Sequence, residues 1–138
     1  MIPFSARNIL VPVDLRNREE SRKAVELAVE TARPDGGTVS ILSVVNPLGK
    51  HFTEGGKQHE PAFKSFVSEE STRLDYPIEA LFRSHESPNR IIRETIEKKD
   101  TDLVIMSTHH PKLTDVVFGS HASQTALHAD CSVFILRD

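Results

Sequence analysis

Two apolar runs near the end of the chain, Asp102-Leu-Val-Ile-Met-Ser107 and Ser132-Val-Phe-Ile-Leu136, decide the fold. Both are rich in β-branched residues and have the length of buried strands. Between them lie a polar segment, the pair Gly119-Ser120 and a helical pattern over residues 122–129. In a parallel sheet this order places a loop and a helix N-terminus at the carboxyl ends of the strands, where such folds bind ligands. We therefore expect any binding site in this region.

The same alternation of strand and helix fills the rest of the chain. Further strands are predicted over residues 8–15, 38–45 and 78–82, and helices over 18–33, 62–74 and 88–100. The first strand should end or loosen at Pro12, which has no N–H to donate. Residues 48–61 contain three glycines without periodicity, which predicts a mobile surface loop.

This alternation is typical of right-handed crossovers and a parallel sheet covered on both faces. The sequence therefore predicts a single α/β domain over residues 1–138, with a doubly wound five-stranded parallel sheet and helices on both faces.

Composition narrows the class of protein. With 38% hydrophobic residues, 27% charged residues and a net charge of −3, the chain is typical of a soluble globular domain. This mild acidity argues against binding to nucleic acid or to an anionic membrane, and no apolar run is long enough to span a bilayer. A single cysteine, Cys131, excludes an intramolecular disulfide and any multi-cysteine metal cluster, so we expect a cytoplasmic protein.

Four motifs occur together in one order. They are Ile9-Leu-Val-Pro-Val-Asp14, Asp102-Leu-Val-Ile-Met-Ser-Thr-His109, Gly119-Ser120 and His128-Ala-Asp-Cys-Ser-Val-Phe-Ile-Leu-Arg137. Across residues 7–137 the chain thus resembles the universal stress protein family. The resemblance implies a five-stranded doubly wound sheet and a homodimer that pairs the last strand through Val133, Phe134 and Ile135.

The resemblance also implies a phosphate loop after the fourth strand. Nucleotide-binding members follow the pattern G-x2-G-x9-G-[ST], and here Gly119 and Ser120 match its end. Ser107 and His110 stand where the first two glycines would be, and the spacing to Gly119 is one residue shorter. The loop more closely resembles a sub-branch with Ser-His-x-Pro, some members of which are thought to hold ATP. The implied ligand is ATP or AMP, with Mg²⁺ as an accompanying ion.

The candidate site residues divide between the two parts of such a ligand. Those expected near adenosine are Pro12, Val13, Asp14 and Val45, with backbone groups of the two valines beside the base. Those expected near the phosphates are Ser107, His109, His110, Gly119, Ser120 and His121. A carboxylate only accepts hydrogen bonds, so Asp14 suits an amino or hydroxyl donor, and it could equally cap the first helix or turn. Gly119-Ser120 could hold an anion or simply begin a helix.

Other chemistries lack their residues. His109 and His110 are adjacent and His121 and His128 are seven apart, so neither pair has the i, i+4 spacing of a metal site. The chain has no P-loop, no G-x-G-x-x-G and no G-x-S-x-G. A phosphoacceptor receiver domain would need an acceptor Asp, and the predicted second and third strands end without one. Because no residue is a positioned general base, we expect no enzyme activity beyond very slow ATP hydrolysis. Two functions stay open: a stress regulator that binds an adenine nucleotide, and a nucleotide-free dimeric interaction module.

Overall fold

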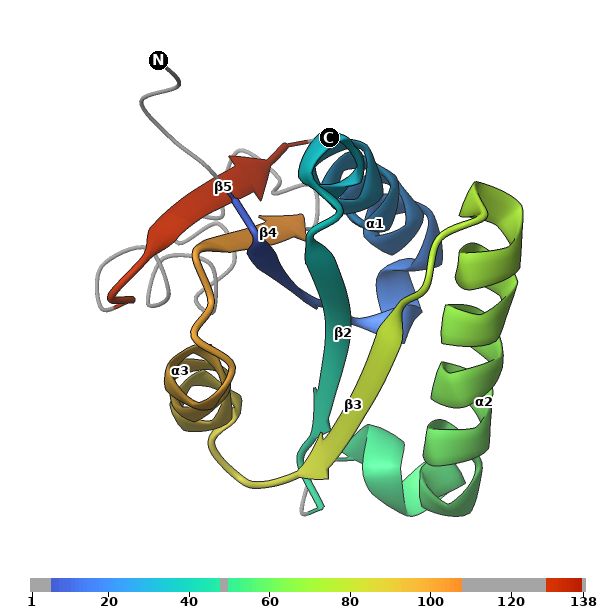
Figure 1. The fold of residues 1–138 in the computed structure, drawn as a ribbon. Coiled ribbons are helices and arrows are strands. Elements are labelled where there is room, and N and C mark those ends of the chain that lie inside the picture. The colour runs from blue at the N-terminus through green and yellow to red at the C-terminus, as the bar shows by residue number, and fades with distance from the viewer. Residues whose placement is uncertain (1–5, 48–49, 108–128, 138) are drawn as a thin grey trace.

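Five parallel strands form one sheet in the order β3-β2-β1-β4-β5 (Figure 1). The computed structural model describes residues 6–47, 50–107 and 129–137. The strands are β1 (Asn8–Pro12), β2 (Thr38–Val45), β3 (Glu79–Ser84), β4 (Leu103–Ser107) and β5 (Ser132–Leu136). The predicted five-stranded parallel sheet is therefore confirmed.

Three α-helices in the described part of the chain cover the two faces of this sheet. They are α1 (Arg18–Ala32), α2 (Lys50–Leu74) and α3 (Pro88–Lys98), and two short 3-10 turns, η1 (Leu15–Asn17) and η2 (Arg33–Asp35), flank α1. In Figure 1, α1 and α2 lie on one side of the strands and α3 lies on the other. The sheet is therefore doubly wound, as predicted. None of the described helices is long and apolar enough to cross a membrane.

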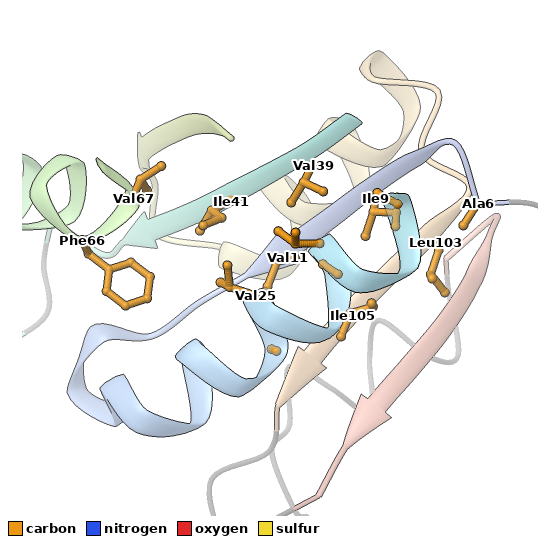
Figure 2. Packing of buried hydrophobic residues seen from close by; sticks show 14 of the residues in the cluster. Ala6, Ile9, Val11, Val25, Val39, Ile41, Phe66, Val67, Leu103 and Ile105 are labelled. Atoms are coloured by element: carbon orange, nitrogen blue, oxygen red, sulfur yellow. The ribbon is translucent and has the colours of Figure 1, made fainter. Parts of the chain in front are cut away.

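The larger core lies between the sheet and helices α1 and α2. Side chains that alternate along β1, β2 and β4 face the small apolar residues of α1, as Figure 2 shows. Two aromatic residues of α2, Phe63 and Phe66, are almost completely buried against the same layer. The fully or nearly fully buried members from the strands and α1 are Ile9, Val11, Ala24, Val25, Ala28, Val29, Ala32, Val39, Ile41 and Ile105. Because strand side chains alternate between faces, the intervening residues pack on the opposite side.

That opposite side carries a smaller core under α3. Leu10, Leu42 and Val104 from three strands form one buried cluster with Ile92 and Ile96, which lie four residues apart on α3. The helix begins at Pro88 with Ser87 as its N-cap residue, as predicted, although the Ser87 side chain makes no capping hydrogen bond. One amphipathic helix therefore covers the centre of this face.

The structure corrects the prediction of a loop over residues 48–61, because α2 already begins at Lys50. Glycines and Pro61 weaken the helical pattern in sequence, since proline removes one backbone hydrogen bond inside a helix. Figure 1 shows the first turns of α2 at an angle to the long remainder, the kind of bend that a proline produces. Burial of Phe63, Phe66 and Val67, at positions i, i+3 and i+4, anchors the helix just beyond Pro61.

Other boundaries differ by a few residues. The first strand ends at Pro12, where it was expected to end or loosen, three residues before the end of the predicted range, and β3 ends at Ser84, two residues beyond the predicted end. The fourth helix predicted over residues 122–129 lies outside the described residues, apart from Ala129, which is not helical.

Backbone contacts tie the amino ends of the strands together. The Asp102 carboxylate accepts hydrogen bonds from the N–H groups of Arg7 and Asn8, both at 3.0 Å, and so joins the start of β4 to the start of β1. Just before β2, the Tyr76 hydroxyl donates to the Gly37 carbonyl at 2.5 Å. A Cβ on Gly37 would lie only 2.7 Å from the Arg7 carbonyl oxygen, so the two backbones are in direct contact there.

Candidate functional site at the carboxyl ends of the strands

The carboxyl ends of β2, β1 and β4 lie side by side, because these strands are neighbours in the sheet. The strand order reverses at β1, with β2 and β3 to one side and β4 and β5 to the other. In open α/β sheets ligands bind outside the carboxyl ends of the strands at such a reversal. The sheet therefore brings the described candidates Pro12, Val13, Asp14, Val45 and Ser107 to one edge.

The first segment of this edge is the end of β1. Pro12 is its last residue, and the following Val13 still donates its N–H to the Leu42 carbonyl at 2.8 Å. The Val13 side chain packs against the larger core, which fixes the backbone at this point. Asp14 is the next residue, with extended backbone angles, and the chain turns into η1 directly after it.

The Asp14 carboxylate is the N-cap of η1. Its Oδ1 accepts from the backbone N–H of Arg16 at 3.0 Å, which is the capping role considered from sequence. The Arg16 guanidinium also binds both carboxylate oxygens, with its Nη2 2.6 Å from Oδ2. This hydrogen bond raises the pKa of Arg16 above its ordinary value. Both side chains are substantially exposed, so the carboxylate lies at the surface of the edge. A contact between Asp14 and adenosine stays a prediction.

The second segment is the end of β2, where the sheet register distinguishes Val44 from Val45. The Val45 carbonyl accepts from the His85 N–H at 2.9 Å, so the backbone groups of Val45 face β3. Successive residues of a strand direct their N–H and C=O to opposite sides. Val44 therefore directs its backbone groups toward β1, as Leu42 does, at a level just beyond the Val13 contact. The structure adds Val44 to the candidates as the residue whose backbone faces the end of β1.

His85, which follows β3, is a further polar residue at this edge that the sequence analysis did not select. Its half-buried ring accepts a hydrogen bond at Nδ1 from the Ser87 N–H, at 2.8 Å. In the neutral ring this contact leaves the proton on Nε2, which is then a donor. The signal in the sequence was its position directly after a predicted strand, next to Ser84. The ring thus helps to fix the turn into α3.

The third segment is the end of β4. Ser107 is its last residue, pairs with Leu136 of β5 and is half-buried. Its position in the alternation of β4 puts its side chain on the same face as Leu103 and Ile105, toward α1. The remaining candidates lie outside the described residues, and they are His109, His110, Gly119, Ser120 and His121. The phosphate half of the predicted site therefore stays a prediction.

Metal and thiol chemistry find little support in the part of the chain that the structure describes. No group of three or more His, Cys, Asp or Glu side chains there is arranged to hold a metal ion. Cys131 is half-buried before β5, and burial raises the pKa of its thiol. A raised pKa lowers the thiolate fraction at neutral pH, so this cysteine is a poor nucleophile.

A hollow of about 210 Å³ lies at the opposite, amino end of the sheet. Its polar lining residues bind one another: Ser40 donates to Glu79 at 3.0 Å, and the Lys99 ammonium lies 2.6 Å from the same carboxylate. Lys99 is also the main cause of the lowered pKa of Glu79. Because these polar groups already bind one another, we assign no ligand to this hollow.

Comparison with known proteins supports the fold that forms the carboxyl edge of the sheet. The model of the Universal stress protein family matches residues 5–137. The chain is 27% identical to Universal stress protein A of Escherichia coli (strain K12) in an alignment of 140 positions that covers 96% of this chain and 96% of that one.

Two solved structures share the fold. Universal stress protein UspA from Lactobacillus plantarum superposes with a TM-score of 0.76 at 20% identity, covering 96% of this chain and 99% of that one. The universal stress protein from Archaeoglobus fulgidus in complex with dAMP has a TM-score of 0.71 at 20% identity, and 98% of both chains is covered. The sequence motifs, the strand order and the match over nearly the whole length lead to one conclusion: the chain belongs to the universal stress protein family.

Proposed function

We propose that the protein binds an adenine nucleotide, ATP or AMP, at the carboxyl ends of β1, β2 and β4, and acts as a regulator in the stress response. The observation that carries the proposal is the placement of Asp14, the Val44 backbone and Ser107 along one edge at the strand-order reversal. A relative of the same fold is a complex with dAMP, which supports an adenine nucleotide as the ligand class.

The chemistry of these groups fits adenosine. An adenine edge presents a ring-nitrogen acceptor beside an amino donor, and the N–H and C=O of one strand residue such as Val44 complement that pair. The Asp14 carboxylate can accept from ribose hydroxyl groups. Mg²⁺, when it accompanies ATP, would be held mainly by the phosphates, since such ions usually take only one or two protein carboxylates.

The proposal includes binding without appreciable turnover. A hydrolase needs a general base within reach of an attacking water. Of the titratable groups that the structure describes at this edge, the Asp14 carboxylate is held by Arg16, and the His85 Nδ1 is held by the Ser87 N–H. We expect purified protein with ATP and Mg²⁺ to release phosphate at a rate close to the buffer control.

Thermal unfolding with ligand tests the binding proposal. ATP and AMP at millimolar concentration, each with and without Mg²⁺, should raise the unfolding temperature, because a ligand at 100 times its Kd adds about 2.7 kcal/mol of stability. GTP is the control for base recognition and should give a smaller shift. The absence of any shift with ATP or AMP would reject nucleotide binding and leave the nucleotide-free interaction module.

We also infer a homodimer through β5, on a separate observation. Phe134 of this edge strand is 47% exposed, the only large hydrophobic side chain so exposed among the described residues. An apolar edge strand left open invites pairing with another chain. Phe134→Asp should convert dimers to monomers in light scattering. Ser84→Asp, on the opposite edge strand β3, is the matched control and should leave the mass unchanged; a dimer that persists in Phe134→Asp would place the interface elsewhere.

A further inference from the structure

Arg16 folds back over the carboxylate that the proposed ligand would use. Its Nε lies 2.9 Å from Oδ1 and 3.0 Å from Oδ2 of Asp14, and its Nη2 lies 2.6 Å from Oδ2. The Arg16 backbone N–H adds a contact to Oδ1 at 3.0 Å. An ionised carboxylate has about four lone-pair sites. The four contacts from Arg16 therefore occupy both oxygens of Asp14.

We propose that Arg16 is a built-in competitor for the nucleoside, an arginine latch formed by the Arg16 guanidinium on Asp14. The inference rests on the proposed function, because it names the regulation of that same site. A ribose hydroxyl or an amino group can bond to Asp14 only after the guanidinium has moved away. The affinity for adenosine is then set by an exchange of donors on Asp14 and not by simple addition of a new contact.

The conformation of η1 by itself brings Arg16 back to Asp14. Asp14 caps the three-residue turn, and the turn places Arg16 two residues later with its side chain directed back to the cap. Every contact that the Arg16 guanidinium makes with the described residues goes to Asp14. No second partner among them holds the arginine in place once the carboxylate is taken.

The exposure of the pair makes the latch reversible. The side chain of Arg16 is 63% exposed and that of Asp14 is 44% exposed, so water and ligand reach both. Exposed ion pairs contribute up to about 1 kcal/mol, which corresponds to about a fivefold change in an equilibrium constant. A nucleoside can therefore displace the arginine, at an affinity reduced by this factor.

Removal of the guanidinium tests the latch. Arg16→Met keeps the aliphatic stem but removes the donors, so adenosine and AMP should both bind about two- to fivefold more tightly in calorimetric titration. Arg18→Met is the matched control. It also removes one positive charge near the edge, but the Arg18 guanidinium lies over the Phe66 ring and contacts Glu69, not Asp14. Its adenosine affinity should equal that of the wild type.

Because adenosine has no phosphate, it distinguishes competition at Asp14 from a role of Arg16 in phosphate binding. If Arg16 instead bound the phosphate of a nucleotide, Arg16→Met would weaken AMP and leave adenosine unchanged, and the latch would be overturned. Unchanged or weaker adenosine binding in Arg16→Met would overturn it as well.

A double-mutant cycle gives a readout that fold damage would not imitate. In an Asp14→Asn background the carboxylate is gone, so adding Arg16→Met should no longer tighten adenosine binding; a gain that persisted would overturn the latch. The Arg16 Nε–H resonance in the free protein should also shift in Asp14→Asn, and no shift would show that the pair does not form. Failure of the proposed function looks different: neither the wild type nor Arg16→Met would bind adenosine or AMP, while the resonance would still report the ion pair.

Discussion

Two aspartates at opposite ends of the sheet show how differently the same side chain is used. At the amino end, Asp102 accepts from two backbone N–H groups of the neighbouring strand segment, and the Asp102 N–H in turn donates to the Asn8 carbonyl at 2.9 Å. At the carboxyl end, Asp14 is held by the flexible side chain of Arg16 and by one N–H of its own turn.

The difference lies in what the partner can do. These N–H groups cannot leave Asp102 unless the start of β1 separates from β4, so its carboxylate holds the two strand starts together. An exposed guanidinium can leave at small cost, so the carboxylate of Asp14 is exchangeable. We therefore expect the amino end of the sheet to serve stability and the carboxyl end, as proposed, to exchange the partners of Asp14 for a ligand.

The largest expected effect tests the rigidity of the amino end. Gly37→Ala would put a Cβ 2.7 Å from the Arg7 carbonyl oxygen, and backbone on both sides would have to shift. We expect a loss of about 3 kcal/mol in the free energy of unfolding, measured by urea denaturation. Gly36→Ala is the control: its Cβ would meet no atom within 4 Å, and only the left-handed backbone, φ +63°, costs about 1 kcal/mol. Equal losses in the two variants would mean that the close approach at Gly37 relaxes freely.

A smaller loss is expected from Asp102→Ala. The N–H groups of Arg7 and Asn8 would lose a charged acceptor, which should cost about 2 kcal/mol of unfolding free energy. Nucleotide binding by the folded fraction should stay as in the wild type, because the change lies at the far end of the strands. A large loss of AMP affinity at temperatures where the variant is folded would contradict this division of roles.

Asp14→Ala should show the reverse pattern. Its exposed ion pair and its cap on η1 contribute about 1 kcal/mol or less to stability, whereas AMP binding should be lost or strongly weakened. Chemical denaturation and calorimetric titration of the same preparation measure both quantities. Intact AMP binding would place the nucleotide away from Asp14 and would remove the functional half of the comparison.

The smallest effect concerns a side-chain ion pair at the amino end, Glu79 with Lys99. The pair lowers the pKa of Glu79 in the folded protein. Its full contribution to stability is present above about pH 4.3, the ordinary pKa of Glu, where the carboxylate is charged in the unfolded state as well. That contribution is lost as the pH falls through the lowered pKa of the folded state. Glu79→Gln should cost about 0.5 kcal/mol or less at pH 7, and the difference from wild type should shrink toward pH 3.

The stability difference between Lys99→Met and the wild type should also shrink toward pH 3, because this change removes the main cause of the lowered pKa of Glu79. A cost for Glu79→Gln that stays constant down to pH 3 would indicate loss of packing and not loss of charge. Either result sharpens the view that backbone contacts, more than surface charge, hold the amino end together.

The sequence predicted most of the scaffold because its strands are short, β-branched and bounded by Pro, Gly or Asn. The exact match of β2 and β5 to their predicted ranges follows from this pattern. Helix α2 was predicted to begin about twelve residues too late, because its first turns contain Gly55, Gly56 and Pro61, which weaken local helix propensity. Packing of Phe63 and Phe66 against the sheet outweighs that local preference, and such a contact has no signature in the nearby sequence.

The candidate site, like the fold, was predicted from the sequence only in part. Sequence placed Asp14 at the end of a strand, but it could not choose between capping and ligand contact, because both use the same carboxylate at the same position. It also selected Val45, whereas the register directs the backbone of Val44 toward β1. Which side a strand residue's N–H and C=O face depends on the pairing of strands far apart in the chain, and composition carries no record of that pairing.

The amino-acid sequence by itself determined the class of fold, the family and the strand that bears the acidic end, because local hydrophobic patterns and short motifs encode these. The structure showed that Arg16 turns back to Asp14 within η1, and the tertiary structure alone decided that Val44 faces β1. It also showed that Asp102 joins two strands whose starts are more than ninety residues apart in the chain. The physical reason is that hydrogen bonds depend on distances and directions, and these are set only once the sheet has assembled.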